Sequence, residues 1–373
     1  MDNSTPRDTQ KPGFPAPRIR ALKSTPARVT PPSADPSRPA RSLHLNESPF
    51  PPSRAAVEAM QVAAAGLNRY PDHDGLALTQ ALAARNGVSA DRIVIGAGSN
   101  EILFASSETS LDPGDEVVMP EPGFPAYAKG ASMADARIVG VPIRADGVLD
   151  IPAMLAAVTD RTRLVFVSSP HNPTGGLLAE ADIRRLVADL PDNLLLHYDE
   201  AYYEFGRAAG GPDTLPILAE RTGPWIATRS FSKAYGLAGA RIGYGIASSA
   251  EVADAFRRIR INFSVGSIAL AGALAALGDV DHLDKILNHT AAERDYLTGA
   301  LRARGLQVLP SAANFVTVIT PRPSVEVAAR LAAGNIHVIA LPWRDTPGAL
   351  RITIGTRADS DATLDALAGA LAP

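Results

Sequence analysis

Two residue types are scarce in this 373-residue sequence, which has no cysteine and only five lysines against 31 arginines. Without cysteine, the chain has no disulfide framework, no thiolate metal site and no cysteine nucleophile. The lysines are Lys11, Lys23, Lys129, Lys233 and Lys285. Any chemistry that needs a lysine amine therefore has few candidates.

A strong charge of one sign and long hydrophobic runs are also missing. The formal net charge of −3 gives no reason to expect nucleic acid or an anionic membrane as a partner. No apolar run approaches the roughly 18 residues of a membrane-spanning helix, and the N-terminus lacks the apolar stretch of a secretory signal. We expect a cytoplasmic globular protein of about two domains that uses no metal.

The first 40 residues differ from the rest, with nine of the 31 prolines and seven basic residues against three acidic ones. Such a segment buries too little apolar area to offset the entropy that it would lose on ordering, so we predict a disordered tail at 1–40. An organelle transit peptide is the alternative. The prolines disfavour it, because they would break an amphipathic helix.

From residue 41 onward, short apolar runs alternate with helical patterns. The runs are rich in valine, isoleucine and leucine and predict buried strands at 93–96, 116–120, 137–141, 164–168, 194–198, 225–228 and 242–246. Helices are predicted at 53–66, with Ser53 as N-cap, and at 100–110 and 179–190. Strands that alternate with helices indicate an α/β fold with a mostly parallel, seven-stranded sheet flanked by helices.

The pattern changes after residue 248. Long helices at 249–262, 267–277 and 281–304 are followed by short strands near 314–319, 336–340 and 350–354 and by a helix from about residue 360. This order predicts a smaller α+β domain. We divide the chain into the tail, an N-terminal segment at 41–67 that packs with the small domain, a large domain at 68–265 and a small C-terminal domain at 266–373.

Lys233 lies in Thr-Arg-Ser-Phe-Ser-Lys-Ala-Tyr-Gly-Leu-Ala-Gly-Ala-Arg at 228–241, just after a predicted strand. Its small and apolar neighbours would partly desolvate the amine, which favours the uncharged form that can make a Schiff base. Ser230, Ser232 and Arg241 in the same loop suit the phosphate of a cofactor that the lysine holds. The alternative is an ordinary surface lysine at a strand end.

Three more polar segments follow predicted strands. Gly-Ala-Gly-Ser-Asn-Glu at 96–101 places backbone N–H groups at a helix N-terminus, which favours a phosphate, and a dinucleotide fingerprint is weak because its third glycine falls on Glu101. Asp199 ends a strand, where it could keep a pyridine nitrogen protonated or simply cap a helix. In the loop at 168–176, Asn172 is a candidate partner of a cofactor oxygen. His171 could be catalytic, but we expect an exposed loop histidine.

Together these segments resemble the class I/II aminotransferases of fold type I, which use pyridoxal 5'-phosphate (PLP). Further matching segments lie at 45–49, 68–71, 313–315 and 350–355, so the resemblance covers almost everything after residue 40. Within the family, the sequence is most similar to the histidinol-phosphate aminotransferase branch. The resemblance implies an aspartate-aminotransferase-like fold and transfer of an amino group from a donor to a 2-oxo acid, which we expect to be 2-oxoglutarate.

The resemblance also implies roles for single residues. Lys233 would bind the cofactor as a Schiff base and, once freed, move a proton from the substrate Cα to the cofactor C4′ carbon. Asp199 would pair with the pyridine nitrogen, and Asn172 and Tyr202 would hydrogen-bond the 3-hydroxyl oxygen. The other assignments are Ser99, Asn100, Ser230, Ser232 and Arg241 to the cofactor phosphate, Phe124 to stacking on the ring, Arg351 with Asn172 to the substrate, and Tyr70 to the phosphate of the neighbouring subunit. The last assignment implies a homodimer with shared active sites.

Two positions depart from the histidinol-phosphate branch. Ile339 stands where an arginine is usual, and Phe50 where a tyrosine follows Asn-Glu-x-Pro. Both changes remove polar groups from the expected substrate pocket, although a bound phosphate favours a guanidinium. Arg344 is a candidate replacement, whereas Trp343 beside it suggests an aromatic or apolar substrate. Histidinol phosphate is therefore our first prediction for the donor, and an aromatic or broad-specificity amino-acid aminotransferase is the alternative.

Two other functions fit parts of the sequence. A PLP-dependent decarboxylase or lyase would use the same lysine and aspartate, so the sequence separates it poorly from a transaminase. A PLP-fold sensor domain of a transcription regulator would need a DNA-binding module, which the proline-rich tail cannot supply. We therefore predict a transaminase.

Overall fold

The computed structural model describes residues 17–20, 22, 40–344 and 346–372. Within the first 40 residues this covers a short helix, α1 (Pro17–Arg20), and residues 22 and 40. The tail predicted to be disordered thus lies mostly outside the described residues.

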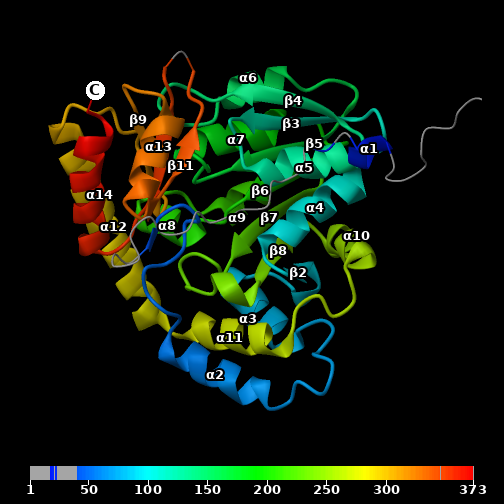
Figure 1. The fold of residues 1–373 in the computed structure, drawn as a ribbon. Helices are drawn as coiled ribbons and strands as arrows, with labels where there is room; N and C mark the ends of the chain where they lie inside the picture. Colours follow the sequence, from blue (N-terminus) through cyan, green and yellow to red (C-terminus); the bar gives the residue numbers. More distant parts are fainter. Residues whose placement is uncertain (1–16, 21, 23–39, 345, 373) are drawn as a thin grey trace, which may run out of the picture.

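A seven-stranded sheet forms the centre of the molecule (Figure 1). In chain order its strands are β2 (Ile93–Gly96), β3 (Glu116–Glu121), β4 (Arg137–Pro142), β5 (Thr162–Ser168), β6 (Leu195–Asp199), β7 (Trp225–Ser230) and β8 (Gly243–Ala247). Their order in space is β2-β8-β7-β6-β5-β3-β4, with β8 antiparallel to both neighbours and the other pairs parallel. The seven predicted strands and the mostly parallel α/β sheet are confirmed.

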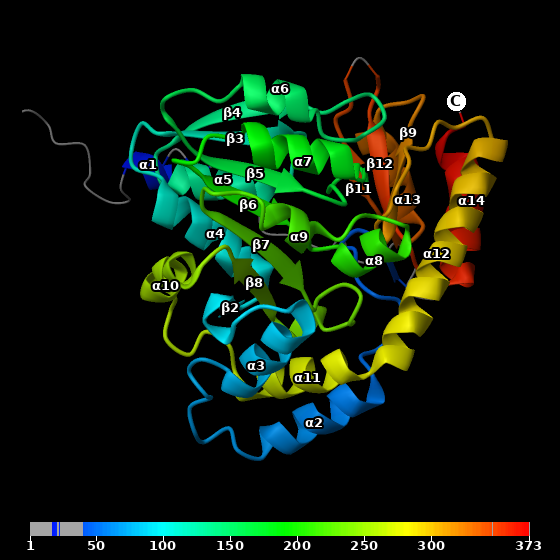
Figure 2. The same ribbon diagram turned by 180° about the vertical axis from the view of Figure 1, so that it is seen from behind.

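Helices cover both faces of this sheet, which explains why its strands are continuous hydrophobic runs rather than alternating ones. Along β5, Leu164 and Phe166 pack into one core, and Val165 and Val167 into another on the opposite face. The first face carries α4 (Ser99–Ser110), α5 (Pro125–Met133) and α10 (Ala250–Ile259). The second carries α3 (Leu76–Asn86), α6 (Ile151–Ala156), α7 (Glu180–Asp189) and α9 (Thr214–Leu218) (Figure 2).

A smaller antiparallel sheet lies beside the large one, in the order β11-β12-β9. Its elements are β9 (Phe315–Ile319), β11 (Ile339–Leu341) and β12 (Ala349–Thr353), with helices α12 (Val280–Ala303), α13 (Ser324–Ala333) and α14 (Arg357–Ala370) around them. The single strand predicted at 336–340 is wrong. Ile336 in β10 (Ile336–His337) pairs with Arg41 of β1 (Arg41–Ser42), whereas Ile339 pairs with Arg351 of β12, so the segment divides between two sheets.

The segment after residue 40 contacts both ends of the molecule. Beyond β1, Leu43 is buried in the C-terminal core, and α2 (Arg54–Ala64) runs along α11 (Ser267–Gly278) (Figure 2). Ser53 caps α2, since its hydroxyl accepts a 3.2 Å hydrogen bond from the Ala56 N–H. Helix α11 shares the core of the large sheet through Ala269 and Ala273. The domain division that we expect at residue 265 stays a prediction.

The carboxyl ends of the central parallel strands meet at one edge of the sheet. Ser168 of β5 is level with Asp199 of β6, which in turn is level with Thr228 of β7. Crevices at this edge are the usual ligand sites of open α/β sheets. Within the described part of the chain, no helix combines the length and apolar character needed to cross a membrane.

Candidate active site

A cavity of about 550 Å³ opens at the carboxyl edge of the large sheet. It is bounded by the ends of β5, β6 and β7, the N-terminus of α4 and, from the C-terminal part, by β11 and β12. Of the residues assigned to the cofactor or the substrate from the sequence, those that line it are Ser99, Asn100, Phe124, Asn172, Asp199, Tyr202, Ser230, Ser232, Lys233, Arg241 and Arg351. Tyr70 does not line the cavity of its own chain.

Lys233 lies in the loop that follows β7, where its amine donates a 2.8 Å hydrogen bond to the Leu45 carbonyl. Burial, followed by the positive charges of Arg351 and Arg241, lowers the pKa of this amine to about 8. A carbonyl partner stabilises the ammonium less than a carboxylate would, so the amine can lose its proton near neutral pH. The structure thus supports a nucleophilic amine rather than an ordinary surface lysine.

Asp199 is the last residue of β6 and is only 6% exposed. Its Oδ2 accepts a 2.6 Å hydrogen bond from the Tyr127 hydroxyl, and its Oδ1 accepts a 3.0 Å bond from the Ala201 N–H. Burial raises the pKa of the carboxyl to about 6. The next helix, α8 (Tyr203–Ala208), begins after Tyr202, so Asp199 is not its N-cap.

The N-terminus of α4 and the loop after β7 meet at one corner of the cavity, where their polar groups suit an anion. Gly98, with φ +78°, precedes α4, and a Cβ at this position would lie 2.6 Å from Nη2 of Arg241. Arg241 donates to the Ala238 carbonyl at 2.9 Å and lies 3.5 Å from the Ser232 hydroxyl. Free backbone N–H groups, a guanidinium and serine hydroxyls converge here, as a phosphate requires.

Arg351 faces the cavity from β12. Its Nη1 donates to Asn172 Oδ1 at 2.6 Å and its Nη2 to the His44 carbonyl at 2.7 Å, whereas Nε is buried without a hydrogen-bond partner. Burial lowers its pKa. Ile339 and Leu341 on the paired strand β11 add an apolar wall.

Tyr202 is held by a residue that the sequence reasoning did not assign. Asn46 donates a 2.8 Å hydrogen bond to the Tyr202 hydroxyl and is itself tied to Thr353 and Asn314. Asn46 lies within 45–49, one of the segments that resemble the aminotransferase family, so the sequence could have marked it as a site residue. Only the structure shows that its partner is Tyr202. Tyr127 was missed in the same way, although it belongs to Pro-Gly-Phe-Pro-Ala-Tyr around Phe124.

Three expectations around the pocket are wrong. His171 is buried, with its ring between the Ser168 hydroxyl at 2.6 Å and the Pro122 carbonyl at 2.9 Å, and burial lowers its pKa to about 4. Phe50 packs edge-on against His289, 4.7 Å between ring centroids, and is not part of the cavity wall.

The third expectation concerns Trp343 and Arg344. Trp343 is buried in the core of the large sheet, and Arg344 donates to the Ile143 carbonyl. Neither residue lines the cavity, so Trp343 gives no evidence about the substrate and Arg344 does not replace the arginine missing at Ile339.

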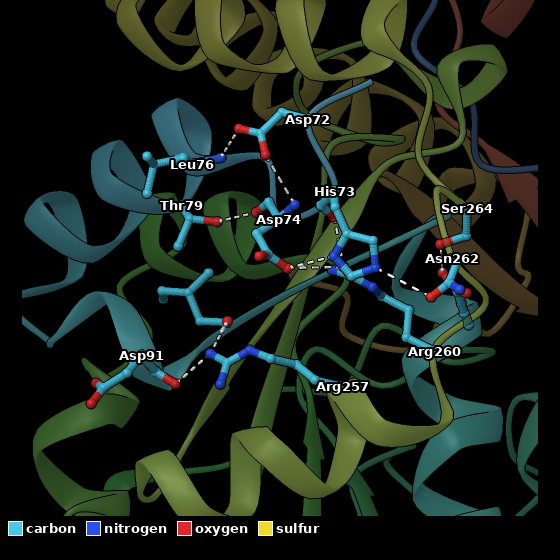
Figure 3. A network of polar contacts seen from close by, with 12 residues as sticks. Asp72, His73, Asp74, Leu76, Thr79, Asp91, Arg257, Arg260, Asn262 and Ser264 are labelled. Atoms are coloured by element: carbon cyan, nitrogen blue, oxygen red, sulfur yellow. Dashed lines mark hydrogen bonds and ion pairs between the residues drawn. The ribbon is translucent and has the colours of Figure 1, made fainter. Parts of the chain in front are cut away.

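Tyr70 belongs to the loop between α2 and α3, where it is 82% exposed and stacks on Phe263 with 4.7 Å between ring centroids. Figure 3 shows how this loop is held against the segment after α10. Arg260 donates to the His73 carbonyl at 2.6 Å and to Asp74 at 3.1 Å, and Asp72 accepts from the N–H of Leu76 at 2.7 Å. Tyr70 is therefore exposed on an ordered loop and does not line its own cavity.

Among the described residues, no group of three or more histidine, aspartate or glutamate side chains is arranged to hold a metal ion. The cavity instead combines an amine, a buried carboxylate and a corner whose polar groups suit an anion.

Comparisons with known proteins agree with this arrangement. Residues 41–367 match the family model for aminotransferase class I and II. A histidinol-phosphate aminotransferase 2 of Caulobacter vibrioides is 39% identical over 88% of this chain and 86% of its own length. An aromatic amino acid aminotransferase of Corynebacterium glutamicum is 39% identical over 81% of this chain and 86% of its own length.

A solved structure has the same fold. The histidinol-phosphate aminotransferase of Sinorhizobium meliloti, crystallised with pyridoxal-5'-phosphate, superposes with a TM-score of 0.88 at 30% identity, covering 97% of this chain and 98% of that one. The aspartate-aminotransferase-like fold expected from the sequence is confirmed. The chain belongs to the class I and II aminotransferase family.

Proposed function

We propose that this protein is a PLP-dependent aminotransferase that moves an amino group from histidinol phosphate to a 2-oxo acid, with 2-oxoglutarate as the acceptor. The observation that carries the proposal is the cavity lysine, Lys233, whose lowered amine pKa accompanies a buried carboxylate and a phosphate corner. The choice of donor is supported by the 39% identity to a histidinol-phosphate aminotransferase.

The side chains of the cavity fit this cofactor. The missing Cβ at Gly98 leaves room beside the Arg241 guanidinium, where a phosphate would meet the N-terminus of α4. Ser99, Asn100, Ser230 and Ser232 border the same corner. Asp199 would hold the pyridine nitrogen, Asn172 and Tyr202 the 3-hydroxyl oxygen, and Phe124 one face of the ring.

The reaction divides between the cofactor and the chain. When bound, PLP supplies a conjugated ring that takes up the electron pair released at the substrate Cα. Lys233 would hold the cofactor and, with its amine free, would take the proton from the substrate Cα and deliver it to the C4′ carbon of the cofactor. Arg351, whose buried Nε has no partner, binds the acidic group of either substrate and orients it.

We also propose a homodimer in which Tyr70 reaches the phosphate site of the partner subunit. The support is the exposure of apolar side chains in the two segments that meet at the Tyr70–Phe263 stack. Tyr70 is 82% exposed, Leu67 in the same loop 57%, and Ile261, two residues before Phe263, 73%. Large exposed apolar side chains are typical of interaction surfaces when they lie together. A cytoplasmic location likewise stays a proposal, which cell fractionation would test.

An aromatic or broad-specificity amino-acid donor is the second candidate. One argument for it is the apolar wall of Ile339 and Leu341, beside which Arg351 supplies the guanidinium. The other is the similarity to an aromatic amino acid aminotransferase. A panel of donors with 2-oxoglutarate separates the candidates. Preference for histidinol phosphate over phenylalanine supports the first, the reverse supports the second, and no glutamate from any donor favours a decarboxylase or lyase.

The cofactor assignment has a direct test. Purified protein should show the visible absorbance of lysine-bound PLP, and Lys233→Ala should remove it. Lys129→Ala is the matched control, because Lys129 lies on α5 outside the cavity lining. Unchanged absorbance in Lys233→Ala would rule out the assignment.

A further inference from the structure

The buried hydrogen bond between Tyr127 and Asp199 lies behind the proposed cofactor site. Tyr127 is fully buried on α5, and its hydroxyl lies 2.6 Å from Asp199 Oδ2. A hydroxyl that donates to a carboxylate at this distance makes a strong, charge-assisted hydrogen bond. Tyr127 itself does not line the cavity, so it acts on a ligand only through Asp199.

Packing fixes the position of this hydroxyl. The Tyr127 ring stacks on Phe166 with 4.6 Å between centroids and 12° between planes, and Phe124 meets it nearly at right angles, 5.8 Å away. Phe166 is fully buried in the core between the sheet and α4 and α5. The ring therefore has little freedom to turn its hydroxyl away from Asp199.

Few other groups stabilise the Asp199 charge. Among the described side chains, Thr228 is the other hydroxyl near the carboxylate, at 3.5 Å from Oδ1, and the Ala201 N–H completes the set. His197, two residues before Asp199 on β6, bonds Thr228 at 3.0 Å and Ser106 at 2.6 Å, and burial keeps it neutral by lowering its pKa to about 3. The adjoining Glu200 carries a like charge, and Tyr202 faces the same pocket as a neutral phenol.

We propose that Tyr127 is a positioning residue that lowers the basicity of Asp199, so that the proton shared between Asp199 and the cofactor ring nitrogen stays on the nitrogen. This inference rests on the proposed function, in which Asp199 faces that nitrogen. The proton can reside either on the Asp199 carboxylate or on the ring nitrogen. A hydrogen bond to the carboxylate stabilises its charged form and leaves the ring cationic, which is the form that withdraws electrons.

The test is the protonation state of the ring nitrogen in the holoenzyme. The variant is Tyr127→Phe, which removes the hydroxyl and keeps the stacked ring. With PLP labelled with ¹⁵N at the ring nitrogen, NMR should show a protonated nitrogen in the wild type and a shift toward the neutral form in Tyr127→Phe. We expect kcat/KM to fall roughly ten- to a hundredfold, which is the effect of losing one hydrogen bond to a charged group. The thermal stability of the variant is measured as well, to show that the fold is retained.

The controls separate the possible causes. Tyr198→Phe removes another fully buried tyrosine hydroxyl on the strand of Asp199 and should leave the nitrogen signal unchanged. Thr228→Val removes the longer contact and should give a smaller shift than Tyr127→Phe.

Two results would overturn the inference. A nitrogen that stays protonated in Tyr127→Phe while it shifts in Asp199→Asn would exclude the role of Tyr127 and leave that of Asp199. A nitrogen that is unchanged in Asp199→Asn, or a wild-type protein that binds no PLP, would contradict the proposed function itself.

Discussion

At the scale of single residues, Lys233 and Asp199 have pKa values that are shifted in opposite directions by the same cause. Burial disfavours the charged form of any group, so it lowers the pKa of the amine to about 8 and raises that of the carboxyl to about 6. The two groups thus titrate nearer to neutral pH than an exposed lysine and aspartate would. Perturbed groups of this kind cluster at functional sites.

The first prediction concerns the amine in the apoprotein. Covalent capture of an aldehyde such as PLP requires unprotonated Lys233, so its rate should rise with a midpoint near pH 8 rather than near 10.5. About a tenth of the amine is free one pH unit below the midpoint and about nine tenths one unit above it. Stopped-flow absorbance across pH 6–11 measures this. A rate that rises only above pH 10 would mean that Lys233 is an ordinary exposed lysine.

The second prediction concerns Asp199 and the stability of the apoprotein. The pKa of Asp199 in the folded protein, about 6, exceeds the ordinary value of 3.8. The neutral carboxyl therefore contributes to the stability of the fold below pH 3.8, and this contribution is lost as the pH rises through 6. Asp199→Asn should therefore raise the free energy of unfolding by about 1–3 kcal/mol at pH 8 and change it little at pH 4, while activity is lost. Urea denaturation at both pH values checks it, and equal effects at the two would contradict the cause given.

At the scale of elements, the site depends on a close approach between the start of α4 and the loop after β7. Gly98 adopts φ +78° beside Arg241, and a Cβ at Gly243 in β8 would lie 2.3 Å from the backbone nitrogen of Ser99. Glycine is needed at both positions, at Gly98 for its conformation and at Gly243 for its missing side chain. The proposed phosphate corner therefore depends on backbone packing as much as on polar side chains.

The third prediction is that Gly98→Ala weakens PLP binding. An alanine at this φ costs roughly 1–2 kcal/mol and its Cβ displaces the Arg241 guanidinium, so the dissociation constant should rise about tenfold or more. Gly299→Ala is the control, because Gly299 is exposed within α12 and its added Cβ meets nothing within 4 Å. Equal affinities of the two variants, measured by equilibrium dialysis, would argue against the phosphate corner.

At the scale of the whole molecule, the cavity is built from distant parts of the chain. Residues from the segment after β1, from the large sheet and from β11 and β12 all border it. The exposed Tyr70 loop faces outward instead, held by Arg260 (Figure 3). A site completed by a partner subunit would explain both the ordered loop and the exposed tyrosine that it carries.

The fourth prediction tests this shared site with mixed subunits. Lys233→Ala and Tyr70→Ala should each have low activity, and a refolded equal mixture should regain about a quarter of the wild-type value, because half of the dimers then contain one intact site. Lys233→Ala mixed with Asp199→Asn should regain nothing, since both residues serve the cavity of their own chain. Equal activity in the two mixtures would exclude the proposed role of Tyr70.

The sequence alone determined the seven strands of the large sheet, their mostly parallel order and the polar residues that follow these strands at the cavity. These features follow from local causes. Buried strands appear as apolar runs in the sequence. Residues at or just after the ends of parallel strands, such as Asp199 in β6 and Lys233 after β7, gather at one edge of the sheet. Ser53 was likewise readable as a helix cap from its neighbours alone.

Only the tertiary structure decided which groups touch. The Tyr127 hydroxyl meets Asp199 across 72 positions of the chain, and Asn46 reaches Tyr202 across 156. The tertiary structure also divides the strand expected at 336–340 between two sheets. His171, which we expected at the surface, is buried, and so is Trp343, which we expected near the substrate. The physical reason is that partners, burial and the resulting pKa values depend on contacts between segments far apart in the chain, which composition and local periodicity do not encode.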